Sequence, residues 1–90
     1  MMRAVITVTG KDTVGILARV STMCAKYNAN VIEVSQTVLQ DMFAMIMMVN
    51  IDRTTCELHE LVDIMRTEGE QHGLVIQVMH EDLFNSMHRI

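Results

Sequence analysis

The fold is decided by one apolar stretch near the middle of the chain, MFAMIMMVNI, at residues 42–51. Alternate positions in this stretch form two sets, and both are apolar. One set is Phe43, Met45, Met47, Val49 and Ile51, and the other is Met42, Ala44, Ile46 and Met48. A strand that is apolar on both sides is typical of a central strand whose two faces are both covered. Residues 43–51 are therefore predicted to form a central strand of a sheet.

Three other segments alternate in the manner of strands with a single apolar face. They are residues 3–9 with Ala4, Ile6 and Val8, residues 31–40 with Ile32, Val34 and Val38, and residues 74–79 with Leu74, Ile76 and Val78. Gln40 and Asp41 lie between two of the predicted strands and are expected to form a turn. The chain thus contains four predicted strands.

Two segments between the strands have apolar residues at helical spacing. The first runs from about Val14 to Tyr27, with Asp12 or Thr13 as the expected N-cap and Asn28 at its end. The second follows Thr54-Thr55-Cys56-Glu57, which matches a capping box, and extends to about His72 with Gly73 as a left-handed stop. The last ten residues predict a short amphipathic tail helix, with apolar positions at Leu83, Phe84, Met87 and Ile90.

The resulting order, β-α-β-β-α-β followed by a tail helix, predicts a ferredoxin-like α/β (α+β) sandwich. Right-handed crossovers in this order give a four-stranded antiparallel sheet, order 4-1-3-2, with both helices on one face. Residues 1–80 form the expected domain, and residues 81–90 the tail. The other face of the sheet stays apolar and bare, and such a patch usually marks an interface. We expect the tail helix, a second subunit, or both to cover it.

Composition excludes several classes of protein. The chain has 90 residues, 50% of them hydrophobic and 20% charged, which suits one globular domain and not a disordered segment. No uninterrupted apolar run is long enough for a membrane span, and the N-terminus lacks the pattern of a signal peptide. A net charge of −4 disfavours nucleic-acid binding. Two cysteines are too few for a disulfide scaffold, so a reduced, cytoplasmic protein without membrane contact is expected.

No cofactor, metal site or catalytic activity is predicted from the residues present. Cys56 and His59 supply only two ligands where zinc needs three or four, and the other histidines are dispersed. The first loop, residues 10–15, has neither the cysteine pair of a copper chaperone nor the arginine cradle of an acylphosphatase. The predicted central strands carry only Phe43 as an aromatic side chain, which excludes an RNA-recognition surface.

The same loop resembles the ACT domains, small ligand-sensing modules that regulate amino-acid metabolism. It reads Thr9-Gly10-Lys11-Asp12-Thr13-Val14-Gly15-Ile16-Leu17-Ala18. The matching positions are Asp12, Gly15, Ile16 and Leu17, while Val14 stands where the family usually has Pro. The resemblance continues through Tyr27-Asn28-Ala29-Asn30-Val31 and covers residues 3–79. The tail, residues 81–90, is similar to that of short stand-alone ACT proteins.

This resemblance implies a ligand site between the loop and the start of the second strand of a neighbouring subunit. Its expected residues are Lys11, Asp12, Thr13, Val14, Gly15, Ile16 and Leu17, with Asn30 and Ile32 from the neighbour. A glycine and a helix N-terminus suit a small carboxylate, and Asp12 can accept a hydrogen bond from an α-ammonium. Gly10 occupies a place where some relatives have His. The purely structural alternatives are that Asp12 only caps the helix, Gly15 only permits close packing, and Asn30 only forms a turn.

Three functions follow from these observations. The first is a stand-alone regulatory module, homodimeric or larger, that binds an amino acid or similar metabolite. The second is a protein-interaction adaptor whose working surfaces are the apolar sheet face and the tail helix. The third is a trans-acting subunit of a separate enzyme that binds no ligand. His88 and Arg89 in the tail can either dock a partner protein or complement the helix dipole.

Overall fold

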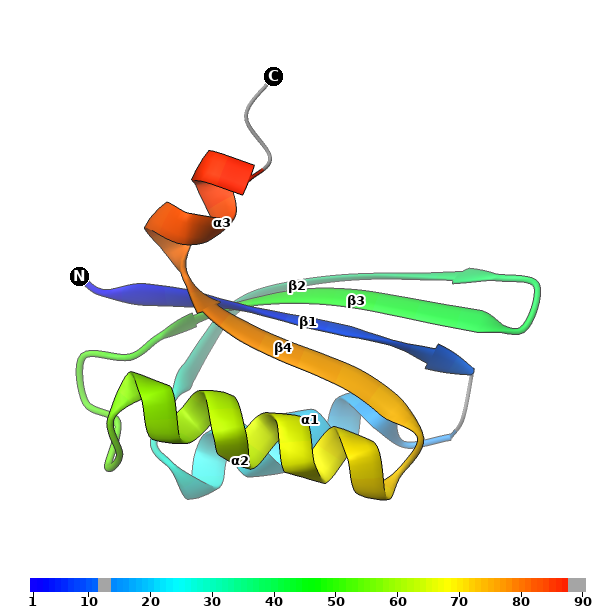
Figure 1. Ribbon diagram of the computed structural model, residues 1–90, viewed down its shortest axis with the longest axis horizontal. Helices are drawn as coiled ribbons and strands as arrows, with labels where there is room; N and C mark the ends of the chain where they lie inside the picture. The colour runs from blue at the N-terminus through cyan, green and yellow to red at the C-terminus, as the bar shows by residue number, and fades with distance from the viewer. Residues whose placement is uncertain (12–13, 88–90) are drawn as a thin grey trace.

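The computed structural model describes residues 1–11 and 14–87. Its elements are β1 (Arg3–Lys11), α1 (Ile16–Lys26), β2 (Asn30–Leu39), β3 (Met42–Asn50), α2 (Leu58–Gln71), β4 (Leu74–His80) and α3 (Glu81–Met87). The strands form one antiparallel sheet in the order β2-β3-β1-β4. Both α1 and α2 cover one face, and α3 rises from the other (Figure 1). The predicted ferredoxin-like topology is confirmed, because 4-1-3-2 is the same order counted from the opposite edge.

The core lies between the sheet and the two long helices. Strand β3 supplies Phe43, Met45, Met47 and Val49 to it, and the pairing places Ile6 of β1 directly opposite Met47. The helices contribute Ile16, Val20 and Cys24 from α1, and Leu61 and Met65 from α2. Three of the ten methionines of the chain, Met45, Met47 and Met65, are at most 1% exposed. Flexible thioether side chains thus fill a core that has few aromatic rings.

Helix α1 begins two residues later than its spacing predicts. Gly15 is the N-cap, in the left-handed conformation at φ 87°, and no side chain of residues 1–11 or 14–87 caps the helix there. Asp12 and Thr13, the expected caps, lie outside the described residues. The other end agrees with the prediction: Asn28 has φ 60°, and the N–H of Ala29 donates to the carbonyl of Cys24 over 2.8 Å. This is a Schellman ending with Asn28 in the left-handed position.

The predicted capping box of α2 is wrong by three residues. Glu57, not Thr54, is the N-cap, and its box partner is Glu60, whose carboxylate accepts the Glu57 N–H at 3.0 Å. The Thr54 hydroxyl instead lies 3.1 Å from the carbonyl oxygens of Ile51 and Cys56. Thr54 therefore stabilises the turn before α2. The helix instead begins at the capping box that Glu57 and Glu60 form. Gly73, at φ 70°, follows the helix as predicted.

The alternation predicts that Ile32 shares a face with Val34 and Val38, and this prediction is wrong. The β2–β3 register shifts between Val31 and Glu33, so that Val31 pairs with Val49 and Val34 with Met47. Ile32 falls at this irregularity and is 44% exposed. A bulge of this kind adds one residue to a strand, so the side chains that precede the bulge point to the opposite face of the sheet from the one that simple alternation predicts. Val31 therefore packs against the core in its place.

Candidate functional site

The loop that carries the family resemblance lies at the end of the sheet where β1 finishes. Lys11 is exposed there and pairs with Met42, the first residue of β3. Val14 and Gly15 are exposed, whereas Ile16 is buried in the core and Leu17 is 38% exposed. The first intrahelical bond of α1 joins the Arg19 N–H to the Gly15 carbonyl at 2.9 Å. The N–H groups of Ile16, Leu17 and Ala18 therefore have no partner within the helix.

A cavity of about 370 Å³ extends from this loop along the groove between α1 and α2. Its lining residues are Gly15, Ala18, Arg19, Thr22, Met23 and Glu68. The Arg19 guanidinium lies 3.7 Å from the Glu68 carboxylate and 3.0 Å from the His72 imidazole. Because the guanidinium is held by a carboxylate of its own chain, it is a weak attractor for a second anion. The N–H groups at the start of α1, which have no partner within the helix, are the stronger anion-binding feature at this end.

The opposite end of the sheet has a larger and more polar pocket, which we call the asparagine pocket. Its volume is about 500 Å³, and its lining residues are Asn28, Asn30, Asn50, Asp52 and Arg53. The Asn28 amide donates to the Arg53 carbonyl at 2.8 Å, and the Asp52 N–H donates to the Asn50 side-chain oxygen at 2.8 Å. These bonds fix the loop between β3 and α2 against the end of α1.

The asparagine pocket combines three carboxamides with one carboxylate and one guanidinium. The Asp52 carboxylate accepts a hydrogen bond from the Met2 N–H at 2.7 Å and has further acceptor capacity. Arg53 is exposed and has no ion-pair partner among the described residues. A guanidinium and a carboxylate beside amides are the groups that bind a small zwitterion, the guanidinium taking its carboxylate and Asp52 its ammonium.

Of the residues that line the asparagine pocket, the family resemblance predicts only Asn30 as a ligand contact. The sequence pattern predicts Asn28 solely as a helix stop, and it does not point to Asn50, Asp52 or Arg53. The available signal was the polar run Asn50-Ile51-Asp52-Arg53 directly after an apolar strand. Polar residues directly after a central strand lie where the chain leaves the sheet, and loops at such positions often form binding sites.

One chain does not bring the two halves of the predicted site together. Asn30 pairs with Asn50, which pairs with Arg3 at the start of β1, whereas Lys11 lies at its end. Strand β1 has nine residues, so its ends are about 26 Å apart at roughly 3.3 Å per residue. Asn30 and Ile32 can join a site with Val14 and Gly15 only if they come from another copy.

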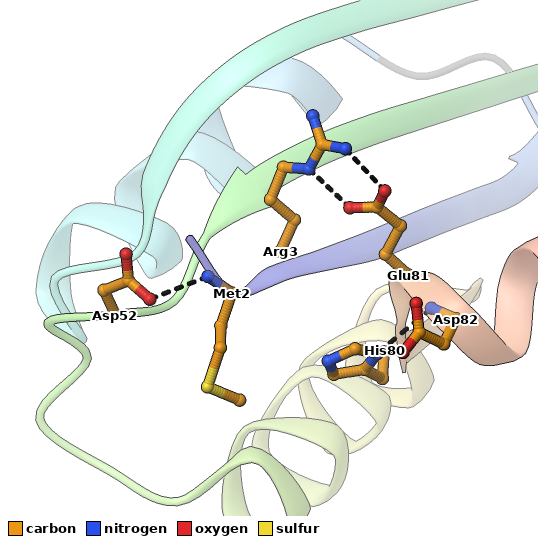
Figure 2. A network of polar contacts seen from close by, with 6 residues as sticks. All are labelled: Met2, Arg3, Asp52, His80, Glu81 and Asp82. Carbon is orange, nitrogen blue, oxygen red and sulfur yellow. Dashed lines mark hydrogen bonds and ion pairs between the residues drawn. The ribbon is translucent and has the colours of Figure 1, made fainter.

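A polar network ties the asparagine-pocket end to α3. Arg3 of β1 makes two hydrogen bonds to the Glu81 carboxylate, and the Asp82 N–H donates to His80 at 3.0 Å (Figure 2). The hydrogen bonds from Arg3 lower the pKa of Glu81, and Glu81 raises the pKa of Arg3. The pair thus holds the first turn of α3 over the start of β1. Asp52 anchors the neighbouring backbone of Met2 in the same view (Figure 2).

The two cysteines have the properties of unreactive thiols. Burial raises the pKa of Cys24 to about 11, and its sulfur lies 3.8 Å from that of Met47. Desolvation, with the charges of Glu60 and Glu57, also raises the pKa of Cys56. A thiol needs a lowered pKa to act as a nucleophile near neutral pH. Within residues 1–11 and 14–87, no three His, Cys, Asp or Glu residues group as metal ligands, and no helix is long and apolar enough to cross a membrane.

Known proteins resemble this chain in sequence and in fold. The family model described as ACT domain matches residues 3–79. A UPF0237 protein of Methanopyrus kandleri is 42% identical over 90 residues, which is the full length of both chains. An ACT domain protein from Streptococcus pneumoniae is 34% identical, with a TM-score of 0.81 and coverage of 92% of this chain and 93% of that one. A formyltetrahydrofolate deformylase from Pseudomonas syringae shares the fold over 28% of its own length, at 21% identity, TM-score 0.81 and 89% coverage of this chain.

Proposed function

Because the chain belongs to the ACT domain family, we propose that it is a regulatory module that binds an amino acid or a similar small zwitterion between two copies. The observation that carries this proposal is the chemistry of the asparagine pocket. It offers one guanidinium, one carboxylate and three amides within about 500 Å³, which is in the size range of small-molecule sites. The proposed ligand carries one anionic and one cationic group close together.

The loop end of a second copy supplies the other half of the proposed site. There, Asp12 and the N–H groups at the start of α1 act on the same ligand that Asn30 and Arg53 contact. Asn30 donates or accepts one hydrogen bond, and Ile32 provides an apolar wall. The module has no catalytic role of its own in this proposal. Ligand binding instead changes how the two copies are joined, and a partner protein senses that change.

A second candidate function is a protein-interaction adaptor, favoured by a groove along the outer edge of β4. A cavity of about 350 Å³ lies between α2 and α3 there, lined in part by Val62, Ile76, Leu83 and Met87. Leu83 and Met87 are more than half exposed. Because β4 is an edge strand, its free backbone groups can pair with an extended peptide.

The test of the first function is thermal unfolding of the full chain with each of the twenty amino acids at millimolar concentration. A ligand at 100 times its Kd stabilises a protein by about 2.7 kcal/mol. For a domain of this size, each kcal/mol raises Tm by roughly 4–8 °C. We expect one amino acid, or one chemical group of them, to raise Tm by about 10 °C or more.

Two variants and a control assign the response to the proposed residues. Asp12→Ala and Arg53→Gln should each abolish the rise in Tm, since each removes a charge that binds the ligand in the proposed site. Arg66→Gln is the matched control, because Arg66 is an exposed arginine paired with Asp63 on α2. If none of the twenty amino acids raises Tm, the result contradicts the amino-acid proposal and favours the adaptor. A rise that survives both variants contradicts the site.

A further inference from the structure

Among the described residues, the sheet face opposite α1 and α2, which we call the open face, is covered only at one end. Val5 lies on this face, is 0% exposed, and is not part of the core on the helix side. Its cross-strand neighbours Met48 and Met79 are half-buried. Helix α3 contacts β1 and β4 here, and Arg3 holds its first turn through Glu81 (Figure 2).

The remainder of the open face exposes large apolar side chains. Leu39, Met42, Ile46 and Val75 are between 47% and 74% exposed. The register places them on the same face as Val5, interspersed with uncharged side chains, namely Thr7, Thr9, Ser35, Thr37, Ala44 and Gln77. The charged residues of this face, Lys11, Glu33 and Arg3, lie toward its margins. An apolar centre with a polar rim is the anatomy of a protein interface.

Helix α3 is too short to cover this surface. Its seven residues span about 10 Å at 1.5 Å per residue. Four strands of up to ten residues present a face about 30 Å long and about 19 Å wide, on the order of 550 Å² in projection. Two such faces, less the part under α3, bury roughly 1,000 Å² together, which meets the lower limit for a specific interface.

We propose that the uncovered part of the open face binds a second copy of this chain, sheet against sheet, with the two α3 helices at opposite ends. The lack of charge at its centre makes the surface compatible with itself, because a two-fold interface places the same patch on both subunits. The position of α3 sets the orientation. It rises from one end of the open face (Figure 1), so two copies with their α3 helices at the same end would collide.

This arrangement has a consequence for the ligand site that rests on the proposed function. With the α3 helices at opposite ends, the Gly15 end of one copy lies toward the asparagine-pocket end of the other. The start of α1 lies on the helix side of each sheet, so the two packed sheets separate it from the pocket of the other copy. The shared ligand site therefore needs a second contact between copies. The interface itself does not depend on any ligand.

The test is the molar mass of the ligand-free full chain, measured by size exclusion with light scattering at micromolar concentration. Wild type should have twice the chain mass of 10.2 kDa. Ile46→Glu and Val75→Lys should each have the mass of one chain, because both place a charge on the open face. Val38→Glu is the matched control and should remain dimeric. Val38 is 51% exposed on the same sheet but pairs with Phe43 on the helix side.

Circular dichroism and Tm of each variant establish that the chain is folded when its mass is read. A monomeric wild type overturns the interface, as does a dimer that survives both open-face substitutions. Dissociation by Val38→Glu alone also overturns it, because that result places the contact on edge strand β2. A monomeric wild type that still responds to an amino acid overturns the interface and leaves ligand binding in place.

Discussion

Strand β3 lies at the centre of the sheet and has apolar side chains on both faces, yet the two faces differ in what covers them. Met47 is 0% exposed beneath α1 and α2, while its neighbour Ile46, on the open face, is 47% exposed. The two residues are of similar size and hydrophobicity and share the same strand. The apolar pattern therefore predicts that each face needs covering, but the covering layer depends on the rest of the chain or on another molecule.

The largest expected effect is a difference in stability between substitutions of Met47 and of Ile46. Met47→Ala should lower the free energy of unfolding by about 2–5 kcal/mol, because it leaves a cavity in a packed core. Ile46→Ala should lower it by less than about 1.5 kcal/mol at low protein concentration, where little covers that side chain. Chemical unfolding at several protein concentrations checks both. Only the effect of Ile46→Ala should grow with concentration, and a concentration-independent loss equal to that of Met47→Ala would contradict the comparison.

The second prediction tests how closely the helix side is packed. A Cβ at Gly69 would lie 2.7 Å from the Leu74 carbonyl oxygen and 2.9 Å from a side-chain carbon of Ile76. Gly69→Ala should therefore destabilise the protein by about 1–3 kcal/mol, although alanine normally favours a helix by about 1 kcal/mol over glycine. Thr67→Ala, at an exposed position of α2, is the control and should be neutral or slightly stabilising. A stabilising Gly69→Ala would show that α2 can move away from β4.

The third prediction concerns the asparagine-pocket end. Asn28 has φ 60° and its side chain donates to the Arg53 carbonyl. Asn28→Ala loses both the tolerance of the left-handed region and that bond, so we expect about 1–2 kcal/mol of destabilisation. Asn28→Gly restores only the backbone freedom and should recover part of the loss. Thermal unfolding of the three proteins checks the order wild type, Asn28→Gly, Asn28→Ala, and a reversed order of the two variants would contradict it.

The smallest expected effect lies in the contact that covers one end of the open face. Since Arg3 lowers the pKa of Glu81 in the folded protein, this pair stabilises the fold above the ordinary pKa of a glutamate. That contribution is lost as pH falls through the lowered value. The difference in Tm between wild type and Glu81→Gln should therefore shrink between pH 6 and pH 3. Glu70→Gln, on the exposed side of α2, is the control, and a pH-independent difference for Glu81→Gln would contradict the prediction.

Most of the fold could be predicted from the sequence, because periodicity, glycine positions and strand order agree with one another. The predictions were wrong where two local interactions or conformations compete for the same residues. Thr54 satisfies the carbonyl of Ile51 instead of capping α2, and the bulge at Ile32 exchanges the faces of Val31 and Ile32. Alternation alone does not reveal a bulge, since one added residue leaves the composition of the strand unchanged.

The candidate site was only partly predictable. The loop around Gly15 is a local pattern and could be recognised. The asparagine pocket depends on the β1–β3 and β2–β3 pairings, which bring Asn30 and Asn50 side by side although 20 positions separate them in sequence. Arg53 and Asp52 join them through the turn after β3, whose geometry the sequence does not specify. The family resemblance predicts a shared site, and the separation of its two halves along β1 explains why two copies are needed.

The central claim, that two copies share each ligand site, is tested most directly by mixing two inactive variants. Asp12→Ala lacks the loop half, and Arg53→Gln lacks the pocket half. Unfolding and refolding them together in equal amounts gives half mixed dimers, each with one intact site, so about a quarter of wild-type binding should return. The measurement is the titrated number of sites for the amino acid that raises Tm. Recovery near one quarter is the predicted result, and no recovery in a mixture shown to contain mixed dimers would contradict it.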